Sequence, residues 1–334
     1  MELSRDEIRL ALPSKGRLAA EALELLAAAG LAVHKPNPRQ YMATIPRLPA
    51  LTVLFQRASD IAISVRDGSV DFGITGLDVV SEQQGDDGRV LILLEDLGFG
   101  ACRLCAIVPE AWSNVHEMAH LKDVRRTLER PLRVATKFPV LTKRFFGEFG
   151  YDDTQLIAAE GTLEIAPDIG YADMIVDLVS TGTTLRDNRL RSLDDGLILS
   201  SQACLIANKA RLQARPGVLA VAKQLLEFVV AHLRADENVV VAANVRGRSP
   251  RELAEQMFTM EVIGGLQGPT IAPVFTRDGG DWHAVNIVVQ KRQLSQAIGE
   301  LRQIGGSGVV VTPVNYIFEE EPPAYRRMLA ALEE

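Results

Sequence analysis

The first half of the chain alternates short apolar runs with longer stretches of helical spacing. Residues 8–12 predict a buried strand, and residues 18–29 predict a helix whose apolar face carries Leu23, Leu26 and Ala27. The alternation continues with predicted helices at 59–66 and 139–149, a predicted strand and loop at 70–76 followed by a helix start at 77–82, and a predicted strand at 132–136. Strands that alternate with helices predict an α/β fold with mainly parallel sheets and helices on both faces.

The pattern changes near residue 238. A strand, a helix, two strands, a helix and a strand are predicted, in this order, at 239–244, 250–256, 271–275, 283–289, 291–304 and 308–312. The segment Asp278-Gly279-Gly280-Asp281 is typical of a hairpin turn between the two middle strands. The order β-α-β-β-α-β predicts a ferredoxin-like domain at the end of the chain.

A turn rich in hydroxyl groups follows the predicted strand 174–179. Residues 180–184 read Ser-Thr-Gly-Thr-Thr and precede a predicted helix. One interpretation is an ordinary turn in which Ser or Thr forms the helix N-cap. The other is a phosphate site, because backbone N–H groups, hydroxyls and the helix dipole at a helix start all favour an anion.

Polar segments also follow two other predicted strands, at Ser14–Arg17 and Thr75–Asp78. In parallel α/β sheets, ligands bind at the carboxyl ends of the strands, so these segments and residues 180–184 could share a site. Lys15 and Arg17 would supply phosphate-binding cations there, unless they are simply two solvated side chains of a turn.

Two carboxylates lie near the hydroxyl-rich turn. Asp177 falls close to the end of its strand, where it could accept hydrogen bonds from sugar hydroxyls or act as a capping acid. Glu164 has apolar neighbours and could be a structural hydrogen-bond acceptor or a site acid. All five histidines lie outside the candidate segments. These candidate residues therefore indicate a site that positions its substrate and stabilises charge, and not one that forms a covalent intermediate.

The composition narrows the class of protein. Of 334 residues, 47% are apolar, and 36 Lys and Arg against 43 Asp and Glu give a net charge of −7. This charge argues against nonspecific binding of nucleic acid. The polar start of the chain predicts no signal peptide, and no apolar run is expected to reach the length needed to cross a bilayer. We therefore expect a cytoplasmic protein that does not bind membranes.

Three cysteines are present, and an odd number fits a reducing compartment. Cys102 and Cys105 form a C-x-x-C pattern, but no second pair and no suitably spaced histidine accompany it. We interpret both thiols as strand residues and predict no protein ligands for a metal.

Several segments together resemble a known family. "ALPSKGRL", "DFGITGLDV", "GFGACRL", "GTLEIAP" and "ADMIVDLVSTGTTL" occur in the order found in ATP phosphoribosyltransferases, and "GLQGPTIAPV" resembles the tail of the long form. The resemblance implies two periplasmic-binding-protein-like (type II) α/β domains plus a C-terminal ferredoxin-like (ACT-like) βαββαβ domain. It places the first catalytic domain at 1–100 plus 200–237, the second at 101–199 and the regulatory domain at 238–334.

The resemblance also implies an activity. Such enzymes transfer phosphoribosyl from 5-phosphoribosyl 1-diphosphate (PRPP) to N1 of the adenine of ATP, giving 1-(5-phosphoribosyl)-ATP and pyrophosphate, the first step of L-histidine biosynthesis. Adenine N1 is already nucleophilic, so the lack of a His or Cys dyad is expected. Mg²⁺ is implied as the cofactor, bound mainly by pyrophosphate oxygens and water.

The resemblance assigns roles to individual residues. The PRPP phosphate loop comprises Asp177, Ser180, Thr181, Gly182, Thr183, Thr184 and Leu185, with Asp177 on the ribose hydroxyls. The implied catalytic residues are Lys15, Arg57, Glu164 and Asp177. Asp78 matches an acidic position of the nucleotide and ribose region, and we add Arg17 to this region because of its charge.

The regulatory part of the resemblance implies feedback inhibition by L-histidine and a homo-oligomer between dimer and hexamer. Thr270 matches a position of the histidine pocket. Asn244 stands where some relatives have an aspartate, and an uncharged amide binds an ammonium group less strongly. The alternative is a non-catalytic solute-binding protein or regulatory subunit, which would have no need of the PRPP loop.

Overall fold

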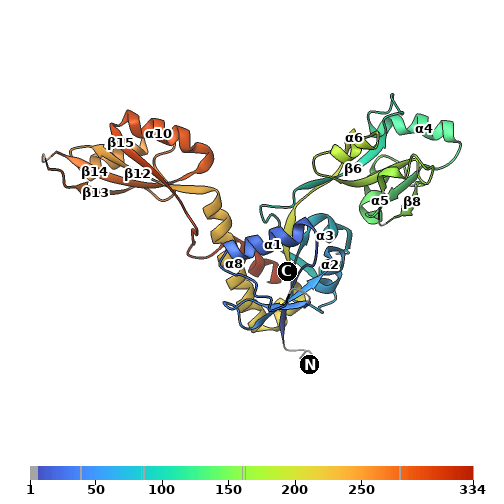
Figure 1. Cartoon of the computed structure of the whole chain (residues 1–334), viewed down its shortest axis with the longest axis horizontal. Helices are drawn as coiled ribbons and strands as arrows, with labels where there is room; N and C mark the ends of the chain where they lie inside the picture. Colours follow the sequence, from blue (N-terminus) through green and yellow to red (C-terminus); the bar gives the residue numbers. More distant parts are fainter. Residues whose placement is uncertain are drawn as a thin grey trace. The chain divides into compact units, whose positions relative to one another are not determined.

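The structure is a computed structural model that describes residues 7–37, 40–83, 85, 87–159, 161, 163–277 and 280–333. The chain divides into two compact units, whose elements are labelled in Figure 1. The first unit contains residues 31–223 together with the segments up to Ala27 and from Ala324, and the second contains Gln224–Pro323 together with Ala28–Gly30. The first unit holds two β-sheets, and the second unit holds one.

The first sheet has the strand order β2-β3-β1-β4-β11-β5. Its strands are β1 (Ile8–Pro13), β2 (Met42–Thr44), β3 (Leu51–Gln56), β4 (Phe72–Gly76), β5 (Val90–Leu94) and β11 (Ala203–Asn208). Strands β3, β1 and β4 are parallel, whereas β11 runs antiparallel between β4 and β5. The accompanying helices are α1 (Arg17–Ala28), α2 (Ala58–Arg66), α3 (Leu77–Gln83) and α7 (Lys209–Ala214).

Helix α1 forms where it was predicted, but its buried face coincides only in part with the predicted one. Its buried residues are Ala22, Leu25 and Leu26, whereas Ala27 is exposed and Leu23 is half-buried. In this alanine- and leucine-rich segment several faces are apolar, so the spacing alone does not select one. The packing of α1 on the sheet makes that choice, so the prediction was right for Leu26 and wrong for Ala27.

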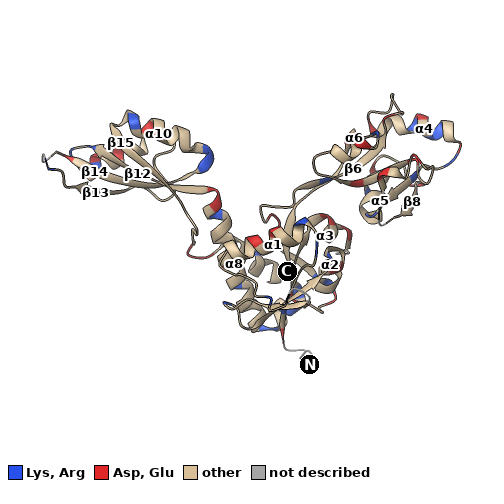
Figure 2. Cartoon of the chain, viewed as in Figure 1, with Lys and Arg blue, Asp and Glu red and all other residues tan. Residues whose placement is uncertain are grey.

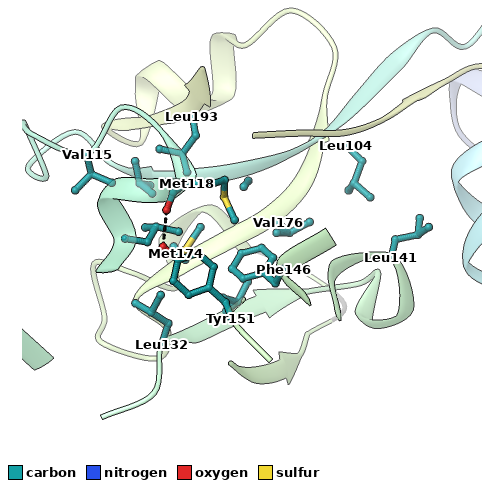
Figure 3. Packing of buried hydrophobic residues seen from close by; sticks show 14 of the residues in the cluster. Leu104, Val115, Met118, Leu132, Leu141, Phe146, Tyr151, Met174, Val176 and Leu193 are labelled. Atoms are coloured by element: carbon teal, nitrogen blue, oxygen red, sulfur yellow. Dashed lines mark hydrogen bonds between the residues drawn. The ribbon is translucent and has the colours of Figure 1, made fainter. Parts of the chain in front are cut away.

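The second sheet has the order β10-β6-β9-β7-β8. Its strands are β6 (Cys102–Pro109), β7 (Arg133–Thr136), β8 (Gln155–Ala158), β9 (Met174–Val179) and β10 (Leu190–Ser201). Its helices are α4 (Leu121–Leu128), α5 (Pro139–Glu148) and α6 (Thr183–Asp187), with 3₁₀ turns at Met118–His120 and Leu163–Ile165. One side of this sheet packs around Phe146, Met174 and Val176, and the hydroxyl of Tyr151 donates a 2.7 Å hydrogen bond to Met118 O (Figure 3).

The two sheets share one arrangement of strands. In each, three parallel strands (β3-β1-β4 or β8-β7-β9) are followed by an antiparallel strand and then by a further strand. The antiparallel strands β11 and β6 lie next to the segments that join the two sheets in the sequence. This repeated order confirms the predicted pair of periplasmic-binding-protein-like α/β domains.

The second unit contains the sheet β13-β14-β12-β15, in which neighbouring strands are antiparallel. Its elements are β12 (Asn238–Arg246), α9 (Pro250–Phe258), β13 (Thr270–Val274), β14 (Trp282–Gln290), a 3₁₀ turn (Lys291–Gln293), α10 (Leu294–Gln303) and β15 (Gly306–Pro313). Alternate residues such as Val241 and Ile287 pack against Leu253 and Leu301 of the helices. The predicted ferredoxin-like βαββαβ order is confirmed; Asp278 and Gly279 of the predicted hairpin turn lie outside the described residues.

Helix α8 (Pro216–Asp236) corrects one expectation. By length and composition alone it could cross a bilayer, so the prediction that no apolar run is that long was wrong. Val218, Ala222 and Leu226 of α8 are nevertheless fully buried in the protein, and one such helix is weak evidence for a membrane span. The last helix, α11 (Pro323–Glu333), falls almost entirely in the first unit. The predicted domain boundaries stay a prediction.

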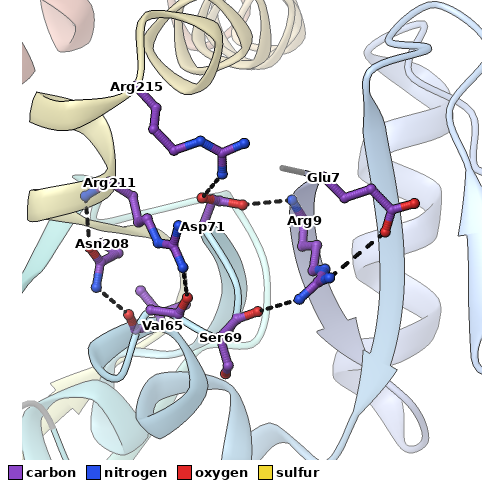
Figure 4. Close-up of polar contacts among 9 residues, drawn as sticks. Glu7, Arg9, Val65, Ser69, Asp71, Asn208, Arg211 and Arg215 are labelled. Carbon is purple, nitrogen blue, oxygen red and sulfur yellow. Dashed lines mark hydrogen bonds and ion pairs between the residues drawn. The ribbon is translucent and has the colours of Figure 1, made fainter. Parts of the chain in front are cut away.

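Polar contacts stabilise the edge of the first sheet where its parallel strands begin (Figure 4). The Asp71 carboxylate accepts a 2.8 Å hydrogen bond from Arg9 N and lies 3.4 Å from a guanidinium nitrogen of Arg215. Burial raises the pKa of Asp71, although the Arg9 N–H and the arginines oppose this shift. Elsewhere, charges of both signs are interspersed along helices such as α4 and α10 (Figure 2). The contacts of Asp71 with Arg9 and Arg215 lie at the edge opposite the carboxyl ends of the parallel strands, where ligands are expected.

Candidate active site

The carboxyl edge of the first sheet carries two of the predicted catalytic cations. Strands β1 and β3 are parallel with Pro13 beside Gln56, and Ser14 N donates a 2.7 Å hydrogen bond to Gln56 O. Lys15 and Arg57 therefore follow neighbouring strands at the same edge, and both are exposed. The sequence placed Lys15 after a predicted strand and gave Arg57 only through the family resemblance, and the register of β1 on β3 brings both to one edge.

Arg17 has a partner on its own helix. Its Nε donates a 2.7 Å hydrogen bond to Glu21 Oε1, and this contact raises the pKa of Arg17. Such an i,i+4 pair stabilises α1 modestly. Lys15, in contrast, has no hydrogen bond or ion pair with any residue that the structure describes. Lys15 is therefore the better placed of the two to bind a ligand.

Asp78 is not on the loop that the sequence predicted, because β4 leads directly into α3. Its backbone N donates a 2.9 Å hydrogen bond to Ser201 Oγ, which in turn donates a 2.6 Å hydrogen bond to Asp78 Oδ1. Its carboxylate lies against Gly76, where a Cβ atom would be 2.3 Å from Oδ1. Only 5% of Asp78 is exposed, so its observed role is to join α3 to the end of β10.

All three cysteines lie in strands, as the sequence predicted for Cys102 and Cys105. Cys102 and Cys105 belong to β6 and Cys204 belongs to β11, and all three are free thiols. Burial raises the pKa of Cys204 to about 12, with further contributions from Asp78 and Glu95. Thiols held in the neutral form are poor nucleophiles and poor metal ligands. Across the described ranges, no three His, Cys, Asp or Glu side chains form a metal-binding group.

The hydroxyl-rich turn lies at the carboxyl end of β9. Gly182 is the N-cap of α6 and has a φ of +74°, a left-handed conformation that favours glycine. The alternative in which Ser or Thr caps this helix through its side chain was therefore wrong. Thr181 and Thr183 are exposed, with their hydroxyl oxygens 3.2 Å apart, while Leu185 is 8% exposed and packs into the core of the second sheet. The turn is thus anchored at Leu185 and presents its hydroxyls to solvent.

The structure brings Asp177 and Glu164 close enough to interact electrostatically. Burial raises the pKa of Asp177, and the Glu164 carboxylate raises it further. The Leu178 N–H donates a 2.8 Å hydrogen bond to Asp177 Oδ1 and lowers this pKa, as does the ammonium group of Lys137. Asp177 is half-buried and Glu164 is partly accessible, so both carboxylates remain within reach of a ligand.

Lys137 is a site residue that the sequence reasoning missed. It follows β7, which is parallel to β9 with Thr136 beside Val176, so Lys137 comes next to Asp177. The signal was available, because residues 132–136 were predicted as a strand and ligands bind after such strands. The fold prediction did not say which strand lies beside β9.

The two predicted regulatory residues lie on one face of the third sheet. Thr270 is paired with Asn286 of β14 and Asn244 with Ala284, two residues away along the same strand. Both predicted residues are exposed. Thr270 helps to line a pocket of about 510 Å³, to which β12 contributes Val240 and not Asn244.

Comparisons with known proteins decide the family. A family model described as ATP phosphoribosyltransferase matches residues 57–233, and one described as HisG, C-terminal domain, matches residues 235–316. ATP phosphoribosyltransferase 1, chloroplastic, of Arabidopsis thaliana is 42% identical over 99% of this chain and 82% of its own length. The chain belongs to the ATP phosphoribosyltransferase family. The family member from Rhodopseudomonas palustris (strain HaA2) is 35% identical over 97% of this chain and 98% of its own length.

Membership of this family makes the protein a pentosyltransferase of histidine biosynthesis. A solved structure is also similar: the ATP phosphoribosyl transferase (HisG:HisZ) complex from Thermotoga maritima has a TM-score of 0.51 and 25% identity. The match covers 67% of this chain and 98% of that chain. The match to the C-terminal family model corresponds to the long form that the tail of the sequence indicated.

Proposed function

We propose that residues 177–185 bind PRPP while its phosphoribosyl group is transferred to N1 of the adenine of ATP. The observation that carries this proposal is the turn around Gly182, which exposes hydroxyl groups at the carboxyl end of β9 beside the half-buried Asp177. Backbone N–H groups and hydroxyls at the start of α6 can donate to the 5-phosphate, since these donors and the local dipole favour an anion. Asp177 would then accept hydrogen bonds from the ribose hydroxyls.

The reaction makes and breaks one bond at C1 of the ribose. The lone pair of adenine N1 forms the N1–C1 bond, while the C1–O bond to the diphosphate breaks and the diphosphate leaves with the electron pair. Positive charge develops on the ribose ring and negative charge on the leaving group. The carboxylates of Asp177 and Glu164 favour the former charge, and cations favour the latter. N1 needs no general base, which fits a site without a nucleophile–base pair.

Mg²⁺ belongs to this proposal as part of the substrate complex. Diphosphate oxygens and water are the ligands that Mg²⁺ prefers when it accompanies a phosphate substrate, and the ion would neutralise charge on the leaving group. The carboxylate oxygens of Asp177 and Glu164 are chemically suited to contact its hydration shell.

The edge of the first sheet supplies the remaining proposed contacts. Lys15 and Arg57 are exposed cations at the ends of neighbouring strands, and we assign them to the phosphates of the substrates. Arg17 is also assigned to the nucleotide region, where its guanidinium would have to share its hydrogen bonds with Glu21. Asp78 is proposed to act in the same region mainly by fixing the start of α3 through Ser201.

Feedback inhibition by L-histidine is proposed for the second unit. The pocket of about 510 Å³ that Thr270 lines also includes Gln267 and Asn286, which offer amide groups to the polar ends of an amino acid. Asn244 lies outside the residues lining this pocket and is uncharged, so we expect weaker retention of the ligand's ammonium group than with an aspartate. A homo-oligomer between dimer and hexamer and a cytoplasmic location complete the proposal, the latter supported by three free thiols.

A direct assay tests the proposal. The protein is incubated with ATP, PRPP and Mg²⁺, and phosphoribosyl-ATP is followed by its absorbance while pyrophosphate is measured separately. Asp177→Asn and Thr184→Val should each reduce turnover at least tenfold without changing the thermal midpoint by more than a few degrees. Full activity in both variants would remove residues 177–185 from the site. A solute-binding protein of this fold would bind a ligand without releasing pyrophosphate.

A further inference from the structure

The turn after β7 is held in one conformation by its own side chains. Thr136 is fully buried, and its Oγ1 accepts a 2.9 Å hydrogen bond from Phe138 N. Thr142 Oγ1 donates a 2.6 Å hydrogen bond to Phe138 O, and Pro139 begins α5 at a position where its fixed φ is favourable. Lys137, between Thr136 and Phe138, therefore projects from a fixed backbone.

A buried carboxylate from another element holds the same region. Glu82 of α3 is 8% exposed, and its Oε1 and Oε2 accept hydrogen bonds from Val140 N at 2.8 Å and Leu141 N at 3.0 Å. These donors belong to the first turn of α5, where a negative charge is stabilised by otherwise unpaired N–H groups. Because charge-assisted hydrogen bonds are strong, Glu82 restrains the start of α5 and with it the adjoining Lys137 turn.

Lys137 itself contributes nothing evident to the stability of the fold. Its side chain is exposed, and it forms no hydrogen bond or ion pair with the described part of the chain. Its ammonium charge nevertheless lowers the pKa of Asp177, the residue that follows Val176 where Val176 pairs with Thr136. A rigid backbone that carries an otherwise uncommitted cation is the arrangement expected of a ligand contact.

The proposed substrate, PRPP, has two anionic groups, the 5-phosphate and the 1-diphosphate, which differ in charge and in their part in the reaction. Residues 180–184 include no cation and offer neutral donors, which suit the 5-phosphate at the start of α6. The 1-diphosphate lies on the other side of the ribose, carries more charge and leaves during the reaction. Asp177, assigned to the ribose, has as its neighbour Lys137, which directly follows the adjacent strand β7. A cation at this position would offset the charge of the diphosphate.

We propose that the ammonium group of Lys137 binds an oxygen of the diphosphate of PRPP, from a turn that Glu82 and Thr136 hold in place. This inference rests on the proposed function of residues 177–185. Lys137 thereby stabilises the charge that develops on the leaving group as the C1–O bond breaks. The competing explanation is that Lys137 only keeps Asp177 ionised, in which case it would affect binding through the ribose and not through the diphosphate.

The test uses Lys137→Met and Lys137→Arg in the full chain, with Lys143→Met as the matched control. Lys143 is an exposed lysine of α5 that has no ion pair within the described residues. Calorimetry measures the affinities for pyrophosphate with Mg²⁺ and for ribose 5-phosphate, and steady-state kinetics gives KM for PRPP and for ATP. Losing a charge-assisted contact should weaken pyrophosphate binding and raise KM for PRPP by about ten- to a hundredfold.

The control measurements make the result specific. In Lys137→Met, the affinity for ribose 5-phosphate and the KM for ATP should stay within about twofold of the values for the unaltered protein, because only an exposed side chain changes. For the same reason the thermal midpoint should change by less than about two degrees. Lys137→Arg should recover most pyrophosphate affinity, and Lys143→Met should match the unaltered protein. Equal weakening of pyrophosphate and ribose 5-phosphate, or no change in either, would overturn the proposal. If the unaltered protein forms no phosphoribosyl-ATP, the proposed function fails, and the two binding measurements still decide the role of Lys137.

Discussion

Asp173, which precedes β9, offers a quantitative test of how the second sheet is stabilised. Asp173 is 9% exposed, and its carboxylate accepts hydrogen bonds from both Nη atoms of Arg130, at 2.6 and 2.8 Å. It also accepts hydrogen bonds from Arg133 N at 2.8 Å and Arg133 Nη2 at 3.0 Å. Burial raises the pKa of Asp173, but the hydrogen bonds from the two arginines outweigh it and hold this pKa far below its usual range.

The substitution Asp173→Asn removes the charge and keeps the shape. An amide retains one acceptor oxygen but turns an NH₂ group toward a guanidinium, so about half of the hydrogen bonds are lost. A hydrogen bond to a charged group contributes about 1.5–3 kcal/mol, and partial solvent exposure of both arginines reduces this value. We therefore expect the variant to lose about 2–3 kcal/mol of unfolding free energy at pH 7.

The pH dependence has a defined sign. Because the pKa of Asp173 is depressed in the folded state, its contribution is complete above the pKa of about 3.9 found in unfolded chains. It is lost as the pH falls from there toward the lower folded pKa. Asparagine does not titrate at this position. The difference in unfolding free energy between the two proteins should be constant from about pH 7 to pH 5 and should shrink below about pH 4.

Urea unfolding followed by tryptophan fluorescence provides the assay. Trp112 packs against the core of the second sheet, so a Trp282→Phe background leaves Trp112 as the only tryptophan reporter. Asp123→Asn is the control, because the Asp123–Arg126 pair is mostly exposed and should change stability by less than about 0.5 kcal/mol. A loss at Asp173 no larger than at Asp123, or a difference that persists unchanged to pH 3, would refute this account.

Three further substitutions have definite expected outcomes. Gly182→Ala places a Cβ at a φ of +74°, so we expect a strain of about 1–2 kcal/mol in the turn. The KM for PRPP should rise while the KM for ATP stays unchanged. An unchanged KM for PRPP would contradict this prediction. Gly76→Ala puts a Cβ 2.3 Å from Asp78 Oδ1, so the thermal midpoint should fall by several degrees; an unaltered midpoint would show that Asp78 moves without cost. Glu82→Gln should lower the unfolding free energy by about 1–2 kcal/mol and raise KM for PRPP, whereas Glu148→Gln on an exposed part of α5 should do neither. Equal effects of the two glutamate variants on KM would rule out a specific role for Glu82.

The sequence alone determined many of the elements and much of the candidate site. Apolar periodicity gave strands β1, β7 and β12 and helices α1, α2 and α5 to within a few residues, because side-chain alternation is a local property of the backbone, whereas β3 and α8 were not predicted. The position of residues 180–184 after a strand followed from the same pattern, and the family motifs gave Asp177 and Glu164. The left-handed conformation at Gly182 was not predicted as such, yet a glycine within that turn is a local signal for it.

Only the tertiary structure decided which distant groups meet. The register of β7 on β9 places Lys137 beside Asp177, and the bond from Ser201 to Asp78 joins residues 123 positions apart in the sequence. Glu82 likewise contacts the first turn of α5 only because the tertiary structure brings α3 and α5 together. Neither periodicity nor composition encodes such pairs, because strand order and helix packing depend on how the whole core is filled. The local pattern therefore determined where chemistry can occur, and the packing of separate segments determined which side chains act together.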